Sequence, residues 1–323
     1  MDERREWKRV PSPNLDPRDS PADNELRAVD GIGHDIWAVG SYDDPGDHEH
    51  APGRYPLIVH DDGSGWTITP ADVSHRAELL DVVRVGPEEV WAVGFTAGSD
   101  SAPMIQRWNG SAWAIVPVPD PSPLSDGLEG ISPMADGSLW AVGWAAGGAE
   151  TLILRWNGRS WRRVSSPSPG ATAQLRAVTT RRDGPPVAIG SFVPGDRPGE
   201  TRTLSLHRVG GTWRRFVSPD PGSYRNVLAG LDRGPHTLQK IWAVGWRERS
   251  AGDGARPLVL RLVDDVWVVE RVPNPYPEGW TELEDVAVFG VPTFDAVGAV
   301  AVGNAHDPAT GDYPAVILRR CSP

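Results

Sequence analysis

Four acidic residues of a repeated pattern, three at corresponding positions and one two residues further along, are the best candidates for acid/base chemistry in this chain. They are Glu25, Glu78, Glu282 and Glu284. Carboxylates gathered at one place repel one another, which raises the pKa of one of them and allows proton exchange with a substrate. The same oxygens suit Ca²⁺, and Glu25, Glu78 and Glu282 are the alternative ligand set for that ion. No redox cofactor is expected.

Aromatic and basic residues at neighbouring positions are the candidates for ligand binding. They are Arg27, Phe95, Trp144, Arg176, Tyr224, Trp246 and Trp280. Aromatic walls supply apolar contact, and a few polar groups orient a small organic molecule. The alternative is that the charged groups are only hydrated, with Arg27 and Arg176 neutralising the carboxylates.

Other chemistry has weaker support in the sequence. The chain lacks the Gly-x-Ser-x-Gly elbow, the phosphate-binding loop, the His-Glu-x-x-His zinc motif and the dinucleotide-binding glycine fingerprint. Residues 43–50 hold several possible metal ligands, including His48 and His50, but a solvated acidic loop is the simpler interpretation. The single cysteine, Cys321, excludes an internal disulfide framework.

Composition limits the classes of partner that this chain is expected to bind. The net charge of −11 over 323 residues argues against nucleic acid, which requires a basic surface. No apolar run approaches the length of a membrane span, so no membrane partner is expected. The N-terminus lacks the pattern of a signal peptide, which predicts a cytoplasmic protein unless a leader was removed.

A phrase of the type Trp-Ala-Val-Gly recurs at intervals of roughly 47–58 residues. The repeat gives each candidate residue its place relative to this phrase. Repeats of this period indicate a solenoid or a propeller. The six copies are 36–40, 90–94, 139–143, 187–190, 241–245 and 300–303, and the fourth and sixth lack the tryptophan.

Each repeat predicts four short strands and no helix. Asn109-Gly110 and Asn157-Gly158 are strong hairpin signals between the third and fourth strands. We therefore predict one all-β domain, 1–323, that forms a six-bladed β-propeller. The expected blades are 25–70, 78–117, 127–165, 174–217, 225–271 and 282–320, the last one closed by the N-terminal strand 6–11.

Tryptophans in two columns are predicted to form the core between blades. Those that begin outer strands are Trp7, Trp66, Trp113, Trp161, Trp213 and Trp267, and those on second strands are Trp37, Trp91, Trp140 and Trp242. The sequence shows no Arg/Glu set that accompanies them. A multivalent lectin would need such a polar set at each blade interface.

The repeat resembles the Trp-Ala-Val-Gly propeller repeats that are widespread in actinobacteria and related soil bacteria. The phrases above and the outer segment 107–113 (Arg-Trp-Asn-Gly-Ser-Ala-Trp) carry the resemblance along essentially the whole chain. The Gly-x-x-Trp spacing at Gly63, Gly110, Gly158 and Gly210 is similar to a relaxed Asp-box turn. The resemblance implies the propeller fold and no single activity.

The six repeats carry different residues at the candidate positions, which favours one asymmetric site. We expect an enzyme that performs cyclisation, isomerisation or hydrolysis on a hydrophobic bacterial secondary metabolite at the mouth of the central channel. The alternatives are a protein-interaction scaffold and a carbohydrate-binding lectin.

Overall fold

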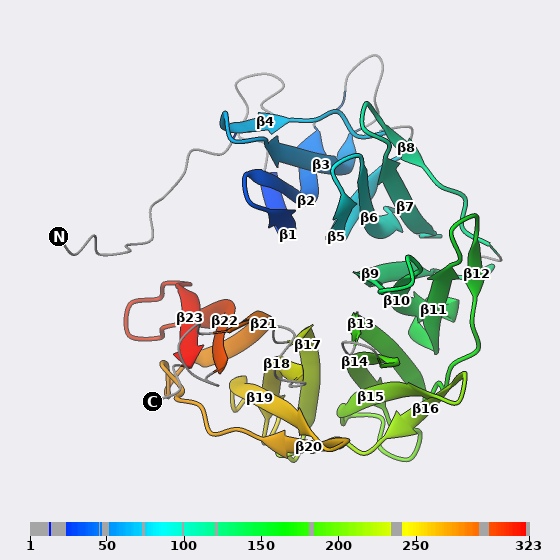
Figure 1. The fold of residues 1–323 in the computed structure, drawn as a ribbon. Coiled ribbons are helices and arrows are strands. Elements are labelled where there is room, and N and C mark those ends of the chain that lie inside the picture. The colour runs from blue at the N-terminus through cyan, green and yellow to red at the C-terminus, as the bar shows by residue number, and fades with distance from the viewer. Residues whose placement is uncertain are drawn as a thin grey trace. The chain divides into compact units, whose positions relative to one another are not determined.

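The computed structural model describes residues 24–44, 46, 52–72, 75–98, 100–119, 122–180, 184–233, 241–290 and 297–320, together with Pro13. Within these ranges the secondary structure is β-strand throughout, apart from a 3-10 turn at Ala146–Gly148. The strands form six antiparallel sheets that follow one another along the chain (Figure 1).

The chain divides into two compact units, and the first comprises Met1–Gly98 and Met104–Val116. It holds two four-stranded sheets, blades 1 and 2. The strands of blade 1 are β1 (Asn24–Ile32), β2 (Asp35–Asp44), β3 (Gly53–Asp61) and β4 (Trp66–Ile68). Those of blade 2 are β5 (Ala77–Gly86), β6 (Glu89–Thr96), β7 (Pro103–Trp108) and β8 (Trp113–Ile115).

The second unit comprises Ser99–Pro103 and Pro117–Pro323 and holds blades 3 to 6. Blade 3 is β9 (Gly127–Pro133), β10 (Leu139–Ala145), β11 (Glu150–Trp156) and β12 (Trp161–Arg163). Blade 4 is β13 (Thr172–Thr180), β14 (Pro186–Val193), β15 (Arg202–Val209) and β16 (Thr212–Phe216). Blade 5 is β17 (Arg225–Arg233), β18 (Ile241–Glu248), β19 (Arg256–Val263) and β20 (Val266–Val269), and blade 6 is β21 (Trp280–Gly290), β22 (Val297–His306) and β23 (Ala315–Arg320).

Six consecutive antiparallel meanders are the blades of a six-bladed β-propeller, as the repeats predict. Five blades have four strands, and the sixth has three within the described residues. The closing strand predicted at 6–11, with Trp7, lies outside those residues. The prediction that 1–323 is one domain stays a prediction.

The first strand of every blade carries a β-bulge at the same step. The pairing of the first and second strands skips one residue opposite the Val-Gly step of the repeated phrase. The bulged residues are Arg27, Leu80, Glu129, Arg176, Ala229 and Glu284. A bulge bends its strand and redirects the side chain of the extra residue. Four of the six are charged, so the bulge sets the direction of the charged candidates.

The glycine that ends each phrase lies against this bulged strand. A Cβ atom added at Gly143 would overlap the carbonyl oxygen of Gly127, and the other five glycines meet the corresponding carbonyl in the same way. The carbonyls belong to Glu25, Glu78, Gly127, Gln174, Val227 and Glu282. A strand glycine with a backbone this close is a packing requirement rather than a turn signal.

Three second-strand tryptophans form core between adjacent blades of one unit, as predicted: Trp37 between blades 1 and 2, Trp140 between blades 3 and 4, and Trp242 between blades 5 and 6. Trp37, Trp91, Trp140 and Trp242 are at most 3% exposed. The Trp140 ring meets the outer-strand Trp213 of blade 4 edge to face, with centroids 5.4 Å apart. Trp37 meets Trp113 of blade 2 at the same distance. Of the outer column, Trp66 is only partly buried.

Replacing Gly143 with Ala is expected to destabilise the protein by about 1–3 kcal/mol, because the new methyl group must displace a neighbouring backbone. Urea unfolding followed by tryptophan fluorescence measures the change. Gly195→Ala is the matched control, since an added Cβ there meets no atom within 4 Å. Equal stability of the two variants would contradict the role given to the glycine.

Candidate functional site

One position of the first strand is structurally equivalent in all six blades. It pairs with the residue that directly follows the glycine of the repeated phrase. The pairs are Glu25–Ser41, Glu78–Phe95, Gly127–Trp144, Gln174–Ser191, Val227–Trp246 and Glu282–Asn304. The candidate acids Glu25, Glu78 and Glu282 therefore occupy equivalent places.

In the first unit, Arg54 joins the candidate carboxylates. Its Nη2 lies 2.8 Å from Oε2 of Glu25, and its Nη1 lies 3.5 Å from Oε2 of Glu78. Nε of Arg54 lies 3.4 Å from Asp43, and Arg27 lies 3.2 Å from Glu25. Burial lowers the pKa of Arg54, but the bond to Glu25 and the charges of Glu78 and Asp43 outweigh it and raise that pKa. These acids are therefore engaged in ion pairs.

In the second unit the acids outnumber their basic partners. Burial raises the pKa of the Glu282 carboxyl, and the charges of Glu284 and Glu248 raise it further, while Arg176 opposes them. Glu248 is paired with Arg225 at 3.9 Å. A carboxyl in this setting holds its proton at a higher pH than a free one, which is a property of a general acid.

The bulged Glu129 belongs to the same cluster. Its side chain is 16% exposed, and its Oε2 lies 3.5 Å from Nη1 of the bulged Arg176. Burial raises its pKa and so does the charge of Glu284, while Arg176 lowers it. The bulged residues Glu129, Arg176 and Glu284 thus form one electrostatic group with Glu282 and Glu248, in blades 3 to 6, which we call the acid cluster.

Asp285 extends this cluster and was missed in the sequence. The residue as a whole is exposed, but its Cα and Oδ1 lie against Gly230 of the neighbouring strand β17. Desolvation on this side raises its pKa to about 6, with the charges of Asp232 and Glu284 adding to the rise. Asp81 accepts the same hydrogen bond, from Val82 N–H, that Asp285 accepts from Val286 N–H. The equivalence of Asp81 and Asp285 in the repeat was the sequence signal that could have drawn attention to Asp285.

Aromatic side chains lie beside Glu282. Trp280 and Glu282 share a face of β21, because they are two residues apart on one strand. The Trp280 ring is stacked with His306 at 6.2 Å and lies 6.1 Å from Tyr313. Trp280 and His306 are both partly exposed. The cluster therefore has a partly accessible aromatic neighbour.

The other predicted binding residues are distributed over both units. Phe95 belongs to the first unit, opposite Glu78. Trp144 lies so close over Gly127 that a Cβ there would overlap its ring. Tyr224 has the guanidinium of Arg225 over its ring at 5.0 Å and donates its N–H to the Glu248 carbonyl. Trp246 pairs with Val227 at the start of blade 5.

No group of three or more acidic, histidine or cysteine side chains is arranged for a metal ion among the residues that the structure describes. Asp43 is paired with Arg54, and Asp44 accepts the N–H of Gly46. His48, His50 and the other ligands between 47 and 50 lie outside the described residues. A calcium ion on Glu25 and Glu78 would have to compete with Arg54.

A polar set does accompany the second-strand tryptophans, contrary to the sequence interpretation. Nε1 of Trp91 donates to Glu89 at 3.0 Å, and Arg107 lies 5.0 Å above the ring and 2.9 Å from Glu89. The corresponding sets are Trp37 with His60 and Asp35, and Trp140 with Arg155 and Asp136. In blade 5, Arg261 lies over Trp242 and pairs with Glu270, an acid that follows the fourth strand instead. The acid and the cation were missed because they come from different strands. The rings are buried, which leaves no face for a sugar.

None of the helical segments in the described ranges is long and apolar enough to cross a membrane.

No family model matches the chain, and no curated protein matches it. Among solved structures, an ulvan lyase of polysaccharide lyase family PL25 bound to -[GlcA(1-4)Rha3S]- is 12% identical, with a TM-score of 0.54. That match covers 93% of this chain and 85% of the other. YCF48 bound to D1 peptide is 15% identical, with a TM-score of 0.48, over 91% of this chain and 95% of the other. At 12% identity the likeness to the ulvan lyase shows the fold alone.

Asp285→Asn is expected to stabilise the protein above about pH 6 and to have little effect near pH 4. The unfolded carboxyl ionises near pH 4 and the folded one at about 6, so the wild type loses stability as the pH rises between these values. Asparagine keeps the acceptor for Val286 N–H and carries no charge. Thermal unfolding from pH 4 to 8 measures the difference, and Asp196→Asn, in an exposed loop, is the control. A pH-independent difference would contradict the assignment.

Proposed function

We propose that this propeller binds a small organic molecule at the acid cluster of blades 3 to 6 and acts on it by acid/base chemistry. Glu282 is the proposed general acid, with Glu129 and Glu284 as its acidic neighbours and Arg176 as their counterion. The reaction classes that fit are hydrolysis, isomerisation and cyclisation, and a hydrophobic bacterial secondary metabolite fits the aromatic residues.

The single observation that carries the proposal is the raised pKa of Glu282 beside an accessible aromatic group. Burial and the charges of Glu284 and Glu248 raise this pKa, so a larger share of Glu282 is protonated near neutral pH than for a free glutamate. Trp280 shares its strand face, and the Trp280–His306 stack offers a flat apolar surface to a ring. Carboxyls whose pKa is raised by burial and by like charges are often found at functional sites.

Three chemical roles follow for the residues. Protonated Glu282 donates its proton to an oxygen or nitrogen atom of the bound molecule. Arg176 stabilises the carboxylates as charge changes, since it lies 3.5 Å from Glu129 and acts on Glu282. Trp280 and His306 orient the molecule by ring contact.

The lectin alternative has less support, because the repeated Trp–cation–acid sets use tryptophans that are at most 3% exposed. A scaffold role uses the same fold and predicts no dependence on the protonation of Glu282. A substitution of Glu282 therefore distinguishes the enzyme from the scaffold.

Replacing Glu282 with Gln is expected to lower turnover by about 10²–10⁴-fold while ligand binding is retained, because glutamine keeps the shape and loses the proton. Hydrolysis is tested with 4-nitrophenyl esters and glycosides, whose phenol product is coloured, and binding by thermal shift with the same compounds. The wild-type rate should fall as the pH rises and Glu282 ionises.

Glu278→Gln is the control, because Glu278 is exposed on the loop that leads into β21. It should leave both rate and binding unchanged. Unchanged turnover and unchanged binding in Glu282→Gln would discard the acid cluster as the site.

A further inference from the structure

Blade 5 has two arginines directly opposite each other, where its second and third strands are joined. Arg247 of β18 pairs with Arg256 of β19 in the antiparallel register. Residues paired in this way have their side chains on one face of the sheet, with Cβ atoms about 4.5–5.5 Å apart. Like charges in this arrangement destabilise a sheet, and a bound negative charge offsets the cost.

The position of Arg247 carries a charged residue in blade 5 alone. It is the second position after the glycine of the repeated phrase, and the other five blades have Tyr42, Thr96, Ala145, Phe192 and Ala305 there. Ala145, Phe192 and Ala305 are buried. Because the repeat does not require an arginine at this position, the role of Arg247 is specific to blade 5.

No acid neutralises Arg247 in the described part of the chain. Its guanidinium is half-buried and has no hydrogen bond or ion pair to a described residue. Burial lowers the pKa of this group, and the charges of Arg249 and Arg256 lower it further. Glu248, the next residue, lies on the opposite face of the strand and pairs with Arg225 at 3.9 Å. Three guanidinium groups therefore lie near one another, and their charges are uncompensated.

Backbone carbonyl groups hold Arg256 in place. Its Nη1 donates to the carbonyl oxygen of Gly279 at 2.7 Å and to that of Tyr276 at 3.4 Å. Its Nη2 donates to the carbonyl oxygen of Asp253 at 3.2 Å. These bonds use three of the five N–H donors of the guanidinium and leave its charge in place. A fixed cation with donors to spare, opposite a half-buried one, is suited to an oxyanion.

The loop between these two strands lies beside the first strand of blade 6. Thr281 N–H donates to the carbonyl oxygen of Ala255 at 2.8 Å. A Cβ atom added at Gly254 would lie 3.5 Å from the Cβ of Trp280, which is partly exposed. A molecule bound by its anionic group at the arginines therefore has an accessible aromatic residue close by.

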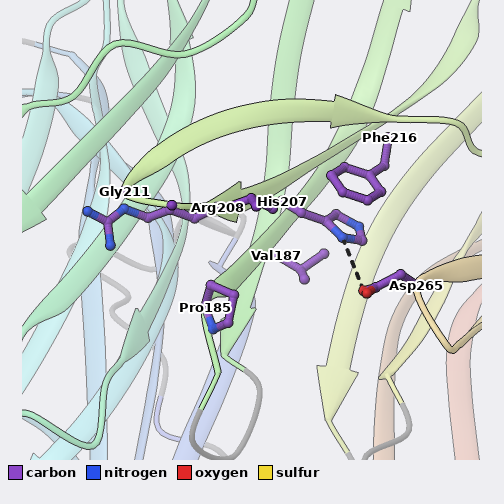
Figure 2. Close-up of a pocket in the computed structure, with 9 residues that line it drawn as sticks. Pro185, Val187, His207, Arg208, Gly211, Phe216 and Asp265 are labelled. Atoms are coloured by element: carbon purple, nitrogen blue, oxygen red, sulfur yellow. Dashed lines mark ion pairs between the residues drawn. The ribbon is translucent and has the colours of Figure 1, made fainter.

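The cavity between blades 4 and 5 has the opposite charge. Its volume is about 390 Å³, and Asp265 is one of the residues that line it (Figure 2). Blade 4 lacks the tryptophan of the repeated phrase here, and Val187 lies opposite His207, whose Nδ1 is 4.0 Å from Oδ1 of Asp265. The guanidinium of Arg208 lies over Trp140 of blade 3. A carboxylate repels an oxyanion, so the arginines of blade 5 are the better site.

We propose that Arg247, Arg249 and Arg256 bind the phosphate or sulfate group of a small molecule. The oxyanion accepts their free N–H groups and offsets the repulsion between the opposed side chains. The site lies in the second unit, and its binding does not depend on the chemistry of the acid cluster.

Inorganic phosphate, sulfate and phenyl phosphate are the probes, and isothermal titration at an ionic strength held constant with NaCl measures their binding. Wild-type protein is expected to bind phosphate and sulfate saturably. Arg247→Gln should weaken phosphate at least about tenfold, because it removes a charge and its hydrogen bonds. Arg214→Gln is the matched control, since it removes the same charge from an exposed position of blade 4 and should leave the affinity unchanged.

The absence of saturable phosphate and sulfate binding in wild type would overturn the proposal, and so would an unchanged affinity in Arg247→Gln. If that variant fails to fold, Arg249→Gln decides by the same criterion, because Arg249 is exposed. Glu282→Gln should bind phosphate as the wild type does, which separates this site from the acid cluster. Phenyl phosphate that binds as tightly as phosphate assigns the site to an ester, and phosphate binding alone assigns it to the free oxyanion; either result supports the proposal.

Discussion

The contact between a bulged first strand and the glycine of the second strand is the constraint on which the other features of each blade depend. The bulge brings a carbonyl oxygen so close to the glycine that no side chain fits there. The bulge also inserts one residue whose side chain departs from the regular alternation between the two faces of the sheet. Because all six blades share this backbone arrangement, the bulged residue can vary without changing the sheet around it. The repeat thus fixes the geometry and leaves the chemistry open.

The charge at these positions differs between the two units. In the first unit, Arg54 from the third strand of blade 1 binds both Glu25 and Glu78, so the acids are neutralised. In the second unit, Arg176 faces several acids, and Glu129, Glu282 and Asp285 all have raised pKa values. Local shortage of positive charge, together with burial, distinguishes the acid cluster as the chemically distinct part of the molecule.

Much of the fold could be predicted from the sequence because the repeated phrase and the Asn-Gly turns act locally. The phrase marks the second strand of every blade, and the structure pairs the residue after its glycine with the same first-strand position each time. The partners of the charged groups could not be predicted in this way. Arg54 lies 29 residues from Glu25, and the Trp91 set combines residues of two strands. Asp285 has a raised pKa because its strand packs against Gly230 and because Asp232 and Glu284 lie near it, and its equivalence to Asp81 in the repeat does not indicate these neighbours.

The loss of one tryptophan in blade 4 has a consequence for how such proteins acquire new roles. In a repeat array, each unit is supported by copies that keep the original packing. One copy can therefore lose a large side chain while its neighbours hold the frame in place. In blade 4 the ring of His207 makes the edge-to-face contact with Trp267 that Trp140 of blade 3 makes with Trp213. Erosion of a repeat can thus change the packing of one interface while the frame around it is kept.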